Sequence, residues 1–404
     1  MIKRIYLDHA AATYLDKRVR RAMNSFWEEN FGNPSSLYKE GRKAKKALDQ
    51  ARAGIASLIN ARPDEIIFTG SGTESDNLAI FGIAKALGVP ISKPKGHIIT
   101  TKIEHHAILN AVENLEEEGF EATYLNVDKN GLVDPIDVKK ALRPDTALVS
   151  VIYANNEIGT IQPIAEISEI IKEYRKNKMG IQEKTPFFHS DACQAAGYLE
   201  MDVEKLGVDL MTVNGSKIYG PKGIGFLYVR SGVKLKPIIY GGGQEKGLRS
   251  GTENLAAIVG LAEAFKIAQQ ERKKESARLI KLRDKLAQGI LKTIPKTVLN
   301  GHPEKRLPNN VNVSILDIEG ESTMLYLDAR GIAVSTGSAC TSRSLEPSHV
   351  ISALGRPFEY GHSSLRLTLG RKTSKKEIDY VLKILPEVAG ILRKISPFLL
   401  KAKK

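Results

Sequence analysis

Short apolar runs alternate with amphipathic helical patterns between Asp64 and Val229. Helical patterns begin at about Thr73 and His105. Because strands alternate with helices, we predict a mainly parallel sheet covered on both faces, with ligands at the carboxyl ends of its strands. The strand candidates, rich in Val, Ile and aromatic residues, are residues 65–70, 97–101, 123–127, 146–153, 186–192 and 209–215.

The pattern changes after about Asn254. A long charged helix is predicted over residues 255–290, and strands at 309–316 and 363–369 mix with amphipathic helices. This second region is typical of a smaller α+β domain.

Composition excludes several classes of protein. The 404 residues are 42% hydrophobic and 26% charged, as in a globular protein, and no run approaches the roughly 20 apolar residues of a membrane span. The start of the chain lacks an apolar signal core, and the two cysteines, Cys193 and Cys340, form neither a disulfide framework nor a zinc motif. We therefore expect a cytoplasmic protein. The net charge of +14 is scattered, which favours a solvated lysine-rich surface over direct DNA binding.

Two polar residues end apolar strands. Lys217 precedes the rigid YGPKGIG hairpin, a setting that favours a lysine bonded covalently to an aldehyde cofactor over a solvated lysine. Asp191 needs a cation, such as a protonated pyridine nitrogen, unless it only caps the next helix. Gln194 is placed to contact a ring oxygen of the same cofactor.

Three further segments carry candidate chemistry, each with a structural alternative. The GSGTESDNLAI segment begins a helix at about Thr73, and the N-terminus of this helix could bind a phosphate. The alternative is an ordinary helix start with an N-cap residue and no ligand. His105 at another strand–helix junction suits stacking and proton transfer, or is structural. Arg366 is the one charged residue in a strand pattern of alternating apolar residues. It would bind a carboxylate if it faces inward, or it is an edge-strand residue that faces solvent.

The two cysteines differ in setting. Small and hydroxylated residues surround Cys340 in STGSACTSRSLEPSHV, which favours a mobile loop with an accessible nucleophilic thiol. Cys193 lies beside an apolar strand and is predicted to be a buried structural residue.

Together these motifs resemble the cysteine desulfurases of the IscS/NifS group, within the class V aminotransferase family of fold type I pyridoxal-phosphate enzymes. The resemblance covers nearly the whole chain, in ten ordered segments: YLDHAAAT, FGNPSS, GSGTESDNLAIFG, TKIEHHAIL, YANNEIGTIQPI, HSDACQAAG, KIYGPKGIGFLYVR, GGGQEKGLRSGTENL, STGSACTSRSLEPSHV and HSSLRLTLGRKT.

The resemblance implies the role of each site residue. Lys217, Cys340 and His105 would be catalytic, and Cys340 would receive sulfur from L-cysteine as a persulfide. Thr252 would reach the phosphate of the opposite subunit, so a homodimer is expected. The implied contacts to pyridoxal 5'-phosphate are Gly72, Thr73, His105, Asn156, Asp191, Gln194, Asn214, Ser216, Lys217 and Thr252. The implied substrate contacts are Arg366, Asn156 and Asn33.

The resemblance also implies the fold and the partners. We expect a mainly parallel seven-stranded sheet between helices in a large domain (residues 15–260), and a smaller α+β domain (1–14 and 261–404), as in the aspartate-aminotransferase-like fold. Sulfur would pass to an iron–sulfur scaffold protein or a tRNA-thiolation acceptor. We expect no resident metal ion. Cys340 would be at most a transient ligand of an iron–sulfur cluster.

One departure from the family pattern lies beside Lys217. The usual Ser-x-His is replaced by Asn214 and Ser216, which still donate hydrogen bonds but lack imidazole charge, so we predict weaker cofactor binding. A selenocysteine lyase or another class V transaminase is the alternative on the same fold. A non-catalytic platform for partner proteins is the third interpretation, supported only by this departure.

Overall fold

The computed structural model describes residues 4–87, 96–177, 185–337 and 348–395. Its main sheet has seven strands in the order β2-β8-β7-β6-β5-β3-β4. The five strands from β7 to β4 are parallel to one another, and β8 runs antiparallel to both β7 and β2, which confirms the predicted mainly parallel sheet. The strands are β2 (Ile66–Thr69), β3 (His97–Thr101), β4 (Glu121–Leu125), β5 (Thr146–Ser150), β6 (Phe187–Asp191), β7 (Leu210–Asn214) and β8 (Gly225–Val229).

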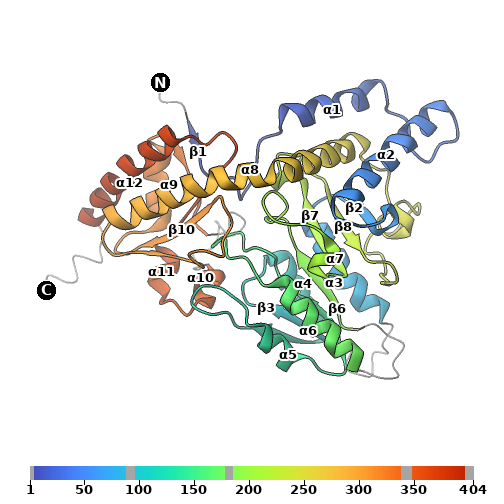
Figure 1. Cartoon of the computed structure of the whole chain (residues 1–404), viewed down its shortest axis with the longest axis horizontal. Coiled ribbons are helices and arrows are strands. Elements are labelled where there is room, and N and C mark those ends of the chain that lie inside the picture. Colours follow the sequence, from blue (N-terminus) through green and yellow to red (C-terminus); the bar gives the residue numbers. More distant parts are fainter. Residues whose placement is uncertain (1–3, 88–95, 178–184, 338–347, 396–404) are drawn as a thin grey trace.

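Helices cover both faces of this sheet. On one face α3 and α4 pack over a core that includes Ile80, Ile108 and Leu148. On the other face α1 and α2 lie along α8, the long predicted helix, above a core that includes Ile55, Phe226 and Phe265 (Figure 1). The helices from the start of the chain to the long helix are α1 (Lys17–Glu28), α2 (Lys39–Leu58), α3 (Gly72–Ala86), α4 (His106–Glu117), α5 (Pro135–Ala141), α6 (Ile164–Asn177), α7 (Val203–Leu206) and α8 (Leu255–Thr293).

The C-terminal part has its own sheets and core. Strand β10 (Asn310–Ile315) pairs antiparallel with β9 (Thr297–Leu299) and β12 (Ser364–Thr368). Strand β1 (Ile5–Tyr6), at the N-terminal end of the chain, pairs in parallel with β11 (Ile332–Ala333) of this part. Leu7 therefore packs in the same core as Val313 and Leu385. The helices here are α9 (Gly320–Asp328), α10 (His349–Ala353), α11 (Phe358–His362) and α12 (Lys375–Ile395). The residue limits of the two domains stay a prediction.

Two predicted strands differ from the structure by more than one residue at an end. Strand β4 begins at Glu121 rather than residue 123. Strand β5 ends at Ser150 rather than residue 153. The N–H groups of Val151 and Tyr153 still donate to carbonyls of β6, but the N–H of Ile152 donates to the side chain of Glu104. The apolar run in the sequence therefore predicts a strand that is too long at the carboxyl end of β5. Within the described ranges, none of the helices is both long and apolar enough to span a membrane.

Candidate active site

The carboxyl ends of the parallel strands open onto a cavity of about 180 Å³. The cavity brings together nine residues that the sequence singled out, from segments spread over most of the chain. They are Gly72, Thr73, His105, Asn156, Asp191, Gln194, Asn214, Lys217 and Arg366. Five other residues complete the lining: Ala10, Ala11, Asp76, Ile152 and Cys193.

Lys217 ends a 3-10 turn (Gly215–Lys217) that directly follows β7. Asn214 caps this turn, since its Oδ1 accepts the N–H of Ser216 at 3.1 Å. The Lys217 ammonium donates to the carbonyl oxygens of Ala10 at 2.9 Å and Ala11 at 2.6 Å. The amine is therefore held at the cavity wall by backbone groups from the first residues of the chain.

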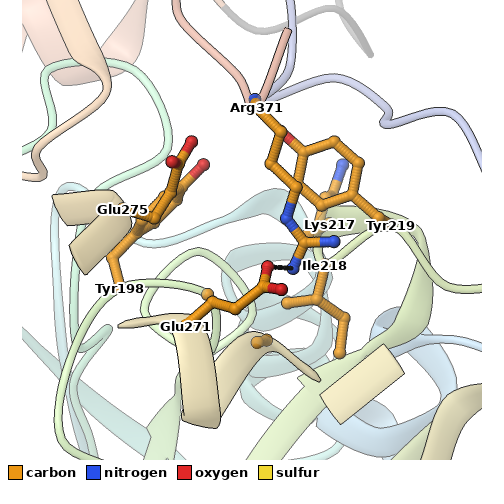
Figure 2. Close-up of a pocket in the computed structure, with 9 residues that line it drawn as sticks. Tyr198, Lys217, Ile218, Tyr219, Glu271, Glu275 and Arg371 are labelled. Carbon is orange, nitrogen blue, oxygen red and sulfur yellow. Dashed lines mark hydrogen bonds and ion pairs between the residues drawn. The ribbon is translucent and has the colours of Figure 1, made fainter. Parts of the chain in front are cut away.

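A second, smaller cavity is lined by Lys217, Tyr219 and Arg371 (Figure 2). Tyr219 has a positive φ of 63°, which is unusual for a residue other than glycine. The Arg371 guanidinium lies 4.3 Å from the centre of the Tyr219 ring, and the backbone N–H of Arg371 donates to the tyrosine hydroxyl at 2.9 Å. An ion pair of 3.7 Å joins Arg371 to Glu271. These contacts fix the backbone two residues after Lys217, and so fix the direction of the lysine.

Asp191 both lines the cavity and caps the turn that follows β6. Its Oδ1 accepts the N–H of Cys193 at 2.9 Å, so the two interpretations of this residue are compatible. Gln194 donates to the carbonyl of Ala10 at 3.0 Å. Burial raises the pKa of the Cys193 thiol well above its usual range, which keeps it a protonated, unreactive thiol. Cys193 is buried as predicted, but it also forms part of the cavity wall.

The predicted phosphate seat is the N-terminus of α3. Ser71 caps the helix by accepting the N–H of Glu74 at 3.1 Å, as the structural alternative also expects. A Cβ atom at Gly72 would lie 2.8 Å from the Cys193 sulfur and 3.2 Å from the Asn214 Cβ. Glycine therefore lets the helix end approach β7 closely, and the free N–H groups and positive end of the helix favour an anion there.

Arg366 faces inward from β12 and is 1% exposed, so the solvent-facing alternative is wrong. Its Nη2 pairs with Asp8 Oδ1 at 2.9 Å, and its Nη1 donates to the Asn156 carbonyl at 3.1 Å. The Nε is buried without a partner within the described residues. A buried guanidinium with an unused donor is suited to a ligand carboxylate.

His105 is the N-cap of α4, since its Nδ1 accepts the N–H of Ala107 at 3.1 Å. In a neutral ring this contact puts the proton on Nε2, so Nε2 is the nitrogen that can donate a hydrogen bond. The neighbouring Glu104 is completely buried, and its Oε1 accepts from Thr101 Oγ1 at 2.7 Å and from the N–H of Ile152 at 2.9 Å. Burial raises the pKa of Glu104 to about 8.

Three acidic residues near the cavity were not singled out from the sequence. Burial, together with the charge of Asp191, raises the pKa of Asp76 well above its usual range. Burial also raises the pKa of Glu104, and Asp8 is paired with Arg366. Their only sequence signal is a charged residue next to apolar ones, which many surface positions share.

Three of the predicted residues that the structure describes are absent from the cavity lining. Asn33 and Thr252 are exposed, and Ser216 is half-buried in the turn beside Lys217. Cys340 lies outside the described residues. Among the residues that the structure describes, no group of three or more His, Cys, Asp or Glu side chains is arranged to hold a metal ion.

Comparison with known proteins identifies the family. The family model described as aminotransferase class-V matches residues 5–381. The chain belongs to the class-V aminotransferase family. Enzymes of this family depend on pyridoxal 5'-phosphate, and the cavity fits that cofactor: a helix N-terminus that only glycine lets approach, an acid for the ring and a lysine amine.

Relatives within the class-V aminotransferase family confirm the predicted group. The chain is 50% identical over 398 residues to the cysteine desulfurase IscS of Dictyoglomus turgidum, covering 98% of both chains. It is 51% identical over 396 residues to the cysteine desulfurase IscS of Methanosarcina thermophila, covering 98% of this chain and 94% of the relative. A solved structure titled NIFS-like protein superposes with a TM-score of 0.87 at 36% identity, over 96% of this chain and 100% of that one.

Proposed function

We propose that this enzyme is a cysteine desulfurase that converts L-cysteine to L-alanine and transfers the sulfur to Cys340 as a persulfide. The observation that carries the proposal is the shared cavity of Lys217, Asp191 and Arg366. An amine for proton transfer, an acid for a pyridine nitrogen and a guanidinium for a carboxylate are the groups that an amino-acid substrate requires of a pyridoxal-phosphate enzyme.

The proposed cofactor contacts follow from the cavity lining. Lys217 would bond to the cofactor aldehyde, Asp191 would pair with the pyridine nitrogen, and Gln194 would contact the ring oxygen. His105 would stack on the ring. The phosphate would be held at the start of α3 and beside β7, by Gly72, Thr73, Asn214 and Ser216. When bound, the cofactor supplies a covalent attachment point for the substrate amine and an electron sink for the α-carbon.

The residues of this chain then have distinct tasks. Arg366 binds the substrate carboxylate, with Asn156 beside it in the cavity lining. The Lys217 amine takes the α-proton and returns it to the product. The Cys340 thiolate attacks the substrate sulfur: an S–S bond forms, the C–S bond breaks, and its electron pair stays with the carbon that becomes the methyl group of alanine. His105 moves a proton near the sulfur through Nε2.

The proposal is tested by measuring alanine and sulfide release from cysteine with wild type, Lys217→Ala and Cys340→Ser. We expect Lys217→Ala to lose turnover altogether, and Cys340→Ser to bind cysteine and change the cofactor spectrum without forming a persulfide. Normal desulfuration by Cys340→Ser would assign the sulfur-accepting step elsewhere. Selenocysteine, and alanine with a keto acid, serve as comparison substrates, because faster turnover of either would favour the lyase or transaminase alternative.

The proposed active unit is a homodimer. Asn33 and Thr252 are exposed and absent from the cavity lining of their own chain. Large apolar side chains are exposed close to Asn33, including Phe31 at 71% and Leu37 at 88%, as at an unoccupied interface. We expect mixtures of inactive Lys217→Ala and Thr252→Ala enzymes to regain activity, because a mixed dimer contains one intact site. A monomer by sedimentation would contradict the proposal.

The sulfur acceptor is proposed as an iron–sulfur scaffold protein or a tRNA-thiolation protein. A cytoplasmic location is proposed because a chain with two cysteines gains nothing from an oxidising compartment. The acceptor is tested by following labelled sulfur from Cys340 to each candidate protein.

A further inference from the structure

Glu157 is a buried carboxylate that the proposed mechanism does not use. It is 1% exposed and follows Asn156 directly. Its backbone is held from two sides: the N–H donates to Asn155 Oδ1 at 2.9 Å, and the carbonyl accepts from the side-chain amides of Asn310 and Asn312 at 3.0 and 3.1 Å. A carboxylate removed from water requires a strong partner, so the contacts of its side chain indicate its role.

Among the residues that the structure describes, Ser348 is the hydrogen-bond partner of the Glu157 side chain. The Ser348 hydroxyl donates to Glu157 Oε2 at 2.5 Å. A Cβ atom at Gly337 would lie 3.3 Å from the same Oε2 and 3.4 Å from the Cβ of Ser348. Gly337 and Ser348 are the described residues on either side of positions 338–347, which include Cys340. Both ends of that segment therefore meet at one buried carboxylate.

The substrate-binding arginine is tied to the same place. Arg366 donates to the carbonyl of Asn156, the residue before Glu157. The backbone of Arg366 also exchanges two hydrogen bonds, of 3.1 and 2.7 Å, with the backbone of Ser335. Ser335 lies two residues before Gly337. Arg366 is therefore linked to Gly337 through the backbone pair with Ser335. It is linked to Ser348 through Asn156 and the Glu157 side chain.

A second contact fastens the later end of the segment. His349, the residue after Ser348, has its Nε2 3.0 Å from the carbonyl oxygen of Glu104, which precedes His105. The ring of His349 packs edge-on against that of His106, with centroids 4.5 Å apart. The start of α10 is therefore attached to the strand–helix junction that carries the proposed proton-transfer histidine.

We infer that Glu157 is a positioning residue for sulfur transfer, which through Ser348 fixes the two ends of the Cys340 segment relative to Arg366. This inference rests on the proposed role of Cys340. An activity that depends on attack by one thiol on one sulfur atom is sensitive to small displacements, since the reacting atoms must approach along a defined line. Cysteine binding, which uses Arg366 and Lys217, does not require the contact.

The test is a double-mutant cycle on the cofactor-loaded enzyme with Glu157→Ala, Ser348→Ala and the double variant. Two quantities are measured: the affinity for cysteine from the change in cofactor absorbance, and the rate of persulfide formation on Cys340 by mass spectrometry. We expect each single change to slow persulfide formation about tenfold or more, with cysteine affinity within about twofold of wild type. The double variant should be no slower than the worse single variant, because both remove one interaction.

Two control variants separate positioning from stability. Ser348 also caps α10 by accepting the N–H of Ile351, so Ser348→Thr, which keeps both the cap and the donor, should restore transfer. Ser352→Ala removes an exposed hydroxyl one turn later on α10 and should behave as wild type. The melting temperature of each cofactor-free variant shows whether it still folds.

The outcomes distinguish this inference from the function on which it rests. If Cys340→Ser desulfurates normally, the proposed function fails, whatever the variants at Glu157 do. If Cys340→Ser is inactive but Glu157→Ala and Ser348→Ala transfer sulfur at the wild-type rate, the function stands and the positioning role is wrong. Equal losses in cysteine affinity and transfer, or additive losses in the double variant, would also overturn it.

Discussion

Arg366 and Asp8 form an ion pair at the cavity although 358 residues separate them in the sequence. The guanidinium is almost completely buried, so a paired carboxylate offsets much of the unfavourable burial of its charge. The same arginine is the proposed ligand of the substrate carboxylate. Asp8 therefore competes for a group that the substrate needs.

We expect Asp8→Asn to lower the KM for cysteine severalfold with kcat within about twofold. The neutral amide still accepts a hydrogen bond from Nη2, but it no longer offers a competing negative charge. Steady-state kinetics measures the effect, with Asp49→Asn on the exposed surface of α2 as the control. An unchanged or higher KM would mean that Asp8 only supports the arginine.

Gly72→Ala should weaken cofactor binding about tenfold or more, because the added methyl group would lie against Cys193 and Asn214 at the end of α3. Removing the sulfur in Gly72→Ala/Cys193→Ala should recover part of the loss. Gly390→Ala, in open space on α12, is the matched control and should be neutral or stabilising by up to about 1 kcal/mol. Equilibrium dialysis of the cofactor measures each affinity. No recovery in the double variant would contradict the steric argument.

Ser216→His should tighten pyridoxal-phosphate binding, because a protonated imidazole adds a charge-assisted hydrogen bond to the phosphate. The gain should be present at about pH 6 and absent at about pH 8.5, where an ordinary histidine is neutral. Cofactor dissociation constants at the two pH values provide the measurement. Equal affinity of wild type and variant at about pH 6 would argue against an electrostatic deficit at this position.

Glu104→Gln should change how stability depends on pH. Burial raises the pKa of Glu104 to about 8, so the folded chain holds a proton that the unfolded chain releases above about pH 4.5. This contribution to stability is complete below about pH 4.5 and is lost as pH rises through about 8. The amide cannot ionise, so the melting temperature of the variant minus that of wild type should increase between about pH 5 and pH 9. A constant difference would mean that Glu104 does not titrate in this range.

The parts of the site that end strands could be predicted from the sequence. Lys217 and Asp191 each close an apolar run, and the carboxyl ends of parallel strands meet at one edge of a sheet. Arg366 was recognisable as a charge within a strand pattern, although only packing decides which way such a residue faces. The mainly parallel sheet followed from the alternation of strands and helices.

The remaining contacts depend on how distant segments meet. Ala10 and Ala11 hold the lysine through backbone carbonyls, which leave no mark in the sequence because every residue has one. The N–H of Ile152, just after β5, donates to a side-chain acceptor, Glu104, that comes from another strand–helix junction. Raised acid pKa values likewise arise from burial in the finished fold.

The pairing of β1 with β11 also bears on synthesis of the chain on the ribosome. Ala10 and Ala11 complete the wall around the lysine, but Asp8 can pair with Arg366 only after β12 has been made. A nascent chain that ends before β12 therefore has the strands around Lys217 without Arg366, the proposed ligand of the substrate carboxylate. The proposed amino-acid site is therefore complete only when the two ends of the chain have met.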